Sequence, residues 1–73
     1  MNKRYIVEFD FGNGFGGIPT EIRAENSELA LNQAQGMLHS EWVNIVTPDG
    51  HPVRMKPDKV IAIRVVDEIA PEA

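Results

Sequence analysis

The segment between Glu41 and Glu68 constrains the fold more than any other part of this chain. Short β-prone runs alternate in it with residues that favour turns. The β-prone runs are residues 42–47, 53–56 and 60–66, and the turns between them are residues 48–50 (Pro-Asp-Gly) and 57–58 (Pro-Asp). Proline presets the φ angle that a turn needs, and glycine accepts a positive φ. The segment therefore predicts three consecutive strands that run antiparallel to one another.

The N-terminal third also reads as β structure. Residues 4–11 and 18–24 alternate between apolar and polar side chains, which is typical of strands with one buried face. Between them lies the glycine-rich stretch 12–17. Two alternating runs on either side of such a stretch predict a β-hairpin.

A helix is predicted after this hairpin. Asn26 or Ser27 would cap its N-terminus, and it would end near Ser40. At 100° per residue, one arc of this helix collects apolar side chains, namely Ala30, Leu31, Ala34, Met37 and Leu38. The expected fold class is α+β: a small antiparallel β-sheet with one α-helix packed on one face, in the order ββαβββ. The order of the strands within the sheet stays open.

The composition is that of a single small domain spanning residues 1–73, with a disordered tail at 69–73. The chain has 42% hydrophobic and 25% charged residues, a formal charge of −4 and no cysteine. The negative charge argues against a dedicated duplex-DNA binder, and the lack of cysteine excludes disulfides. No run resembles a secretory signal or reaches transmembrane length, so a cytoplasmic location is expected.

The glycine-rich stretch matches a nucleotide-binding pattern, because Gly12, Gly14 and Gly17 fit G-x-G-x-x-G. That pattern binds phosphate when a helix starts at its last glycine. Here Ile18 and Pro19 follow and favour a strand instead. We therefore interpret the stretch as a hairpin tip and expect no cofactor, with Phe15 folding back over the core or acting as a contact residue.

Catalytic and metal-binding arrangements are not expected. The two serines, Ser27 and Ser40, occupy helix-end positions, where serine acts as a cap. The two histidines, His39 and His51, lack the spacing of a zinc site. Carboxylates such as Glu8, Asp10 and Glu21 are expected on a solvent face without a cleft. The sequence thus predicts a protein that is not an enzyme.

Strand alternation also assigns two faces to the predicted sheet. The face toward the helix would carry Tyr5, Val7, Phe9, Ile22, Val43, Ile45, Val53, Met55, Ile61, Ile63 and Val65. The outer face would carry five apolar residues, Ile6, Trp42, Val46, Val60 and Val66, and five cations, Arg4, Arg23, Arg54, Lys56 and Arg64. One interpretation is an ordinary solvated face with cross-strand Arg–Glu pairs. The other is a contact surface, because an apolar patch with a charged rim is typical of protein–protein interfaces.

Two functions follow from the second interpretation. The first is a small protein-interaction module, a homodimer or an accessory subunit, that binds through the outer face. The alternative is a binder of single-stranded nucleic acid, with Trp42 stacking on bases and the five cations contacting phosphates. The negative charge of the whole chain and the single aromatic residue on that face favour the first.

Overall fold

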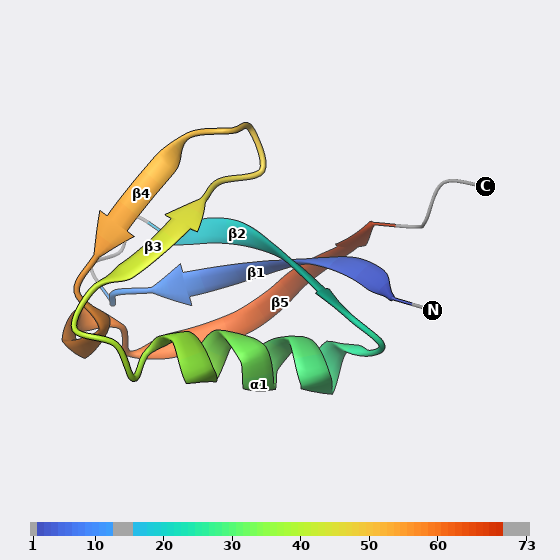
Figure 1. The fold of residues 1–73 in the computed structure, drawn as a ribbon, viewed down its shortest axis with the longest axis horizontal. Coiled ribbons are helices and arrows are strands. Elements are labelled where there is room, and N and C mark those ends of the chain that lie inside the picture. Colours follow the sequence, from blue (N-terminus) through green and yellow to red (C-terminus); the bar gives the residue numbers. More distant parts are fainter. Residues whose placement is uncertain (1, 13–15, 70–73) are drawn as a thin grey trace.

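The computed structural model describes residues 2–12 and 16–69 and confirms the predicted fold class. One helix and five antiparallel strands follow one another in the order ββαβββ (Figure 1). The strands are β1 (Lys3–Asp10), β2 (Gly17–Ala24), β3 (Val43–Val46), β4 (Pro52–Met55) and β5 (Ala62–Ile69). The helix α1 spans Ser27–Met37, and a short 3-10 helix, η1, spans Pro57–Lys59.

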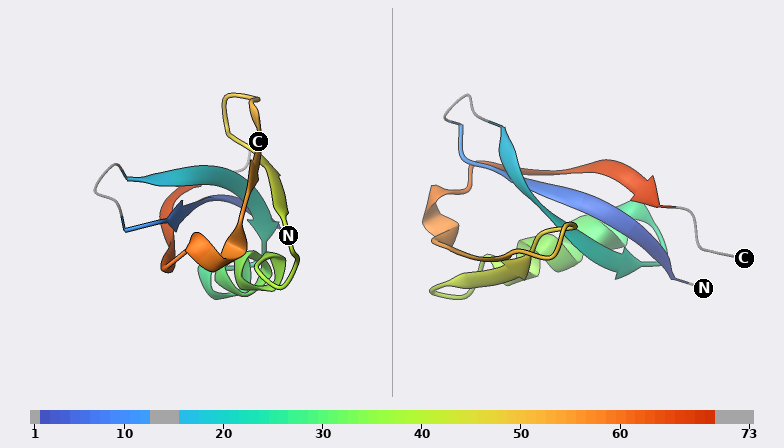
Figure 2. Two further views of the ribbon diagram at one scale, coloured as in Figure 1. Left: turned by 90° about the vertical axis from the view of Figure 1, so that its left-hand side faces the viewer. Right: turned by 90° about the horizontal axis from the view of Figure 1, so that it is seen from above.

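The five strands divide into two sheets. A three-stranded sheet has the order β2-β1-β5, and β3 and β4 form a separate hairpin. The helix α1 lies along one face of the three-stranded sheet, and the hairpin rises steeply beside β2 (Figure 2). The sequence does not determine the strand order. The structure places the first strand, β1, at the centre of the three-stranded sheet.

The hydrophobic core lies where the sheet, α1 and the hairpin meet. Its buried members come from all three parts: Tyr5, Val7, Phe9, Ile22, Ala24, Ala30, Ala34, Val43, Ile45 and Met55. Most of the sheet and hairpin residues predicted to face the helix are among them, and Val53, Ile63 and Val65 pack partly buried against the core. The alternation of the sequence therefore identified the core side of β1, β2, β3 and β4 correctly.

The helix begins at the predicted cap but ends earlier than predicted. The Asn26 side chain accepts a hydrogen bond from the Leu29 backbone N–H (2.9 Å), which satisfies one of the free donors of the first turn. The regular helix ends at Met37, and a tighter turn continues to Ser40, whose N–H donates to the Met37 carbonyl. The alanines Ala30 and Ala34 are its buried residues, so their small side chains let α1 lie close to the sheet.

Two further details of the sequence prediction are corrected by the structure. Ile61 precedes β5 and is 70% exposed. The prediction that it faces the core is therefore wrong. The sequence predicts that Ile69 belongs to the loose tail, but it is the last residue of β5 and pairs with Arg4. Residues 70–73 of the predicted tail lie outside the described residues.

Candidate functional site

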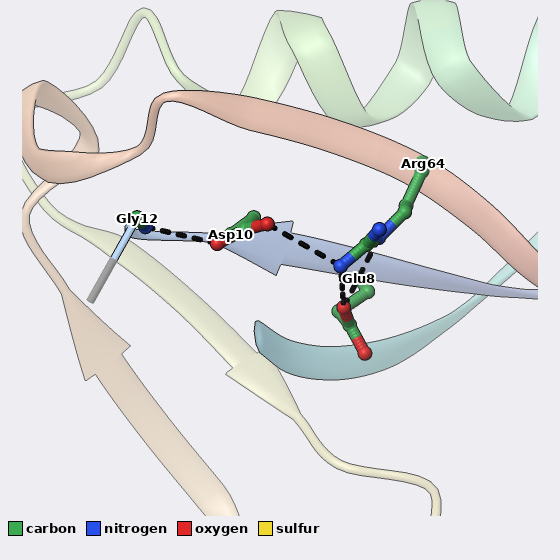
Figure 3. Close-up of polar contacts among 4 residues, drawn as sticks. All are labelled: Glu8, Asp10, Gly12 and Arg64. Carbon is green, nitrogen blue, oxygen red and sulfur yellow. Dashed lines mark hydrogen bonds and ion pairs between the residues drawn. The ribbon is translucent and has the colours of Figure 1, made fainter. Parts of the chain in front are cut away.

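The outer face of the three-stranded sheet is covered by ion pairs between neighbouring strands. Arg4 of β1 donates to Glu21 of β2 from Nε (2.9 Å) and Nη2 (2.6 Å). Arg64 of β5 reaches across to β1 and lies between two carboxylates, Glu8 (2.9 Å) and Asp10 (3.3 Å) (Figure 3). Asp10 also accepts a hydrogen bond from the Gly12 N–H (2.9 Å), which fixes the start of the following loop.

These pairs leave little apolar surface on this face. Ile6 is half-buried and pairs across the strands with Glu21 and Asp67. Partly exposed Arg–carboxylate pairs of this kind contribute about 0.2–1 kcal/mol each. The outer face of the three-stranded sheet therefore has the character of the first interpretation, a solvated face with cross-strand ion pairs.

The outward side of the β3–β4 hairpin is different. We call it the hairpin outer face, and it consists of Trp42, Asn44, Val46, Pro52, Arg54 and Lys56. Trp42 is 44% exposed and Val46 is 56% exposed. The Lys56 Nζ lies 4.5 Å from the centre of the Trp42 ring, a cation–π contact. The Arg54 Nε donates to the Asn44 Oδ1 (2.9 Å). The face thus combines exposed apolar area with two cations that have no carboxylate beside them on this face.

The hairpin turn is held by its own polar side chains. The Thr47 hydroxyl donates to the Asp49 carboxylate, and mainly this hydrogen bond lowers the pKa of Asp49 below its usual range. The His51 Nδ1 lies 3.1 Å from the Asp49 Oδ2, and the His51 N–H donates to the Thr47 Oγ1 (3.0 Å). His51 therefore has a structural role in this turn, next to Gly50 with its φ of +93°.

The five apolar residues predicted to form one patch do not lie together in the structure. Trp42 and Val46 share the hairpin outer face, whereas Ile6 belongs to the three-stranded sheet. Val60 is the residue after η1 and packs partly buried against the core, so its placement on the outer face was wrong. Val66 is 48% exposed at an irregularity in β5, where the register with β1 shifts.

The five predicted cations are not brought together either. Arg4 and Arg64 are ion-paired on the three-stranded sheet, and Arg54 and Lys56 lie on the hairpin. Arg23 is exposed near the end of β2, on the free edge of its sheet. A continuous track of cations along one face, as the nucleic-acid hypothesis requires, is therefore not formed by these five residues.

A groove of about 610 Å³ lies between β2 and β3 and was not anticipated from the sequence. Thr20 and Gln33 both line it and make hydrogen bonds to main-chain carbonyls there. The only signal for it in the sequence was Thr20, a polar residue at an inward position of an apolar run, and the structure shows it buried. Strand pairing, which the sequence left open, decides whether such a groove exists.

Within residues 2–12 and 16–69, no three histidine, aspartate or glutamate side chains are arranged to hold a metal ion. None of the helices that the structure describes has the length and apolar character needed to cross a membrane. The predictions for the tip of the glycine-rich stretch, including Gly14 and Phe15, lie outside the described residues. Scans against protein-family models, curated proteins and solved structures found no match to this chain.

Proposed function

We propose that this protein is a small, non-enzymatic protein-interaction module that acts as an accessory subunit and binds its partner through the hairpin outer face. One observation carries the proposal: Trp42 and Val46 are both exposed on this face, 44% and 56%. Tryptophan is enriched among the residues that dominate binding energy at interfaces. Exposed apolar surface rimmed by polar groups marks such interfaces.

The charge of the face indicates what kind of partner fits. Arg54 and Lys56 give the hairpin outer face a positive charge, although the whole chain carries −4. An acidic protein surface with an apolar centre is complementary to it. A second copy docked face to face would bring the same cations together, which costs energy. Self-association through this face is therefore the weaker version of the proposal and should appear only when salt screens these charges.

Replacing Trp42 with serine should weaken capture of the partner from an extract of the native cells at least tenfold, as expected for an interface anchor. Leu29→Ser is the matched control, because Leu29 is exposed to a similar degree (41%) but lies on α1. Capture is quantified by mass spectrometry against the parent protein. If Trp42→Ser still captures the partner proteins and Leu29→Ser no longer does, the assignment of the face is wrong. Sedimentation of the parent protein alone, at low and high salt, measures self-association. It therefore distinguishes binding to a second copy from binding to a different protein.

The alternative function is binding of single-stranded nucleic acid on the hairpin outer face. It is favoured by one observation, the Lys56 ammonium beside the Trp42 ring with Arg54 on the same face. Against this function, Arg54 and Lys56 are the only cations on this face among the described residues. We expect a mixed-sequence oligonucleotide at 50 mM salt to leave the Trp42 fluorescence unchanged. Quenching that disappears steeply as salt rises would instead show phosphate-driven binding with base stacking and would favour this alternative.

A further inference from the structure

The groove between β2 and β3 has main-chain hydrogen-bonding groups along both walls. Glu21, Ile22 and Arg23 of β2 form one wall, and residues 44–46 of β3 form the other. Gln33 and Met37 of α1 also line it. β2 is an edge strand of the three-stranded sheet, and the edge of β3 away from β4 is free. Two strand edges therefore border a single groove, and its chemistry depends on which backbone groups point into it.

One side-chain hydrogen bond shows which backbone groups of β2 point away from β1. The Gln33 Nε2 donates to the Arg23 carbonyl (3.1 Å), so this carbonyl points away from β1 and toward the groove. In an antiparallel ladder, residues alternate between pointing their backbone N–H and C=O at the partner strand and pointing both away. Glu21, two residues before Arg23, must therefore also direct its N–H and C=O outward. Pro19 fits the same alternation, because it lacks an N–H at a position where none is needed for pairing.

The edge of β3 follows from two hydrogen bonds. The Thr47 N–H donates to the His51 carbonyl (2.9 Å), which makes Val46 and Pro52 a pair that does not exchange backbone hydrogen bonds. The Thr20 hydroxyl donates to the Val46 carbonyl (3.1 Å), so this carbonyl points at β2. By the same alternation, Asn44 directs its N–H and C=O toward β2 as well.

The backbone N–H and C=O groups of the two edges do not pair with each other. Among the described residues, β2 and β3 share no backbone–backbone hydrogen bond, and they belong to different sheets. Side chains of Gln33 and Thr20 bond one carbonyl on each wall, in positions that backbone donors of an added strand would take. The N–H groups of Glu21, Arg23, Asn44 and Val46 have no such side-chain partner among the described residues. Edge groups of this kind are a template for pairing with another chain.

We infer that this groove binds an extended peptide segment of a partner protein by β-strand addition. The segment pairs with the outward N–H and C=O groups of Glu21 on β2, and the N–H groups of Asn44 and Val46 face it from the other wall. The hairpin rises steeply beside β2 (Figure 2), so the peptide runs antiparallel to β2 and meets the β3 wall at an angle. Arg23 is exposed at the groove and makes no ion pair with a described residue, so the segment carries an acidic side chain near it. This site is separate from the hairpin outer face, and the inference does not rest on the proposed function.

The other long free edge of the three-stranded sheet is less suited to strand addition. The register between β1 and β5 shifts between Ile6 and Val7, which leaves Val66 without an opposite residue. A bulge of this kind twists an edge and interrupts its pattern of donors and acceptors, and it is one way in which proteins protect exposed edges. The β2 edge has no such irregularity in its register with β1, and a second edge faces it across the groove.

The first test is amide hydrogen exchange of the free protein. If the assignment of the edges is correct, the amides of Glu21 and Asn44 exchange on the order of 100-fold faster than those of their neighbours Ile22 and Ile45, which are bonded within their sheets. Equal protection of Glu21 and Ile22 would overturn the inference, because no outward donor would then remain on β2.

The second test uses a random hexapeptide library displayed on phage and panned against the immobilised protein. Enriched peptides are measured against Glu21→Pro, which removes the outward N–H, and against the matched control Glu21→Gln, which keeps it. Both variants lose the charge of Glu21 and hence its ion pair with Arg4. We expect Glu21→Gln to bind like the parent and Glu21→Pro about tenfold or more weakly, since a main-chain hydrogen bond is lost and its partner is left unpaired.

Two results would overturn the inference: no peptide enriched over a Glu21→Pro decoy, or equal affinities for the proline and glutamine variants. Proline is tolerated two residues earlier at Pro19, so Glu21→Pro should fold, and a circular dichroism spectrum checks this. If it does not fold, Asn44→Pro and Asn44→Ala repeat the comparison on the other wall. Peptide-bound protein should also show slowed exchange of the Glu21 amide.

Discussion

Replacing Phe9 with alanine should leave this domain largely unfolded at 25 °C. Phe9 is the largest of its fully buried side chains and lies on the central strand β1, between Ile18 of β2 and Ile63 of β5. Truncating a buried phenylalanine costs about 3–5 kcal/mol, through lost apolar contacts and the cavity left behind. A core of this size supplies about 3–5 kcal/mol of net stability. The substitution therefore removes most or all of it.

The measurement is a thermal and urea melt followed by far-UV circular dichroism. Two controls grade the effect by burial. Ile63→Ala, on a side chain that is only partly buried, should cost less than Phe9→Ala. Val66→Ala, on the exposed residue of the β5 irregularity, should leave the free energy of unfolding nearly unchanged. A Phe9→Ala melt like that of Val66→Ala would show that the core is not centred on β1.

The core could be predicted because strand periodicity is a strong signal where a strand is regular. Tyr5, Val7 and Phe9 alternate without interruption, and all three are buried. A strand with one buried face places every second side chain on that face, so one correctly assigned residue assigns its neighbours. The same reasoning holds for the short strands of the hairpin, where Val43 and Ile45 are buried and Val46 is exposed.

The prediction failed where the pleat is interrupted. The alternation of β5, continued toward its start, predicts faces for Val60 and Ile61. Val60 is instead the C-cap residue of η1 and Ile61 lies between this cap and β5, so neither residue follows strand parity. Val66 stands at a register shift, where alternation also breaks. The first interruption depends on the backbone geometry of Pro57–Lys59, and the second depends on how β5 pairs with β1. Neither can be predicted from the polarity of the side chains.

The candidate site could be predicted only in part, because alternation assigns faces but not strand partners. Trp42 and Ile6 both point outward as predicted by parity, yet they belong to different sheets. The division into two sheets turns one predicted surface into an ion-paired face and a hairpin outer face. It also creates the groove between β2 and β3, whose backbone groups carry no signature in the amino-acid sequence.

Replacing Gly17 with alanine should lower the free energy of unfolding by about 2–3 kcal/mol, in the range of an overpacked core. A Cβ at this position would lie 2.5 Å from the Phe9 carbonyl oxygen and against the Glu8 Cγ. The Glu8 side chain can move away, but the carbonyl belongs to the backbone of the central strand. Gly17 pairs with Asp10 at the end of the β1–β2 ladder, so relief of the clash has to distort that ladder.

Two other glycines separate this close approach from other effects of the same substitution. Gly16 has a φ of +83° and open space around it, so Gly16→Ala should cost only the backbone strain, about 1–2 kcal/mol. Gly36 lies in α1, also with open space around it, and Gly36→Ala should raise stability by about 0.5–1 kcal/mol, because alanine favours the helix. Urea melts of the three variants should therefore rank Gly36→Ala above the parent and Gly17→Ala lowest. If Gly17→Ala unfolds at the same urea concentration as Gly36→Ala, then β1 and β2 do not approach each other as closely at Gly17 as the structure shows, and packing does not require a glycine there.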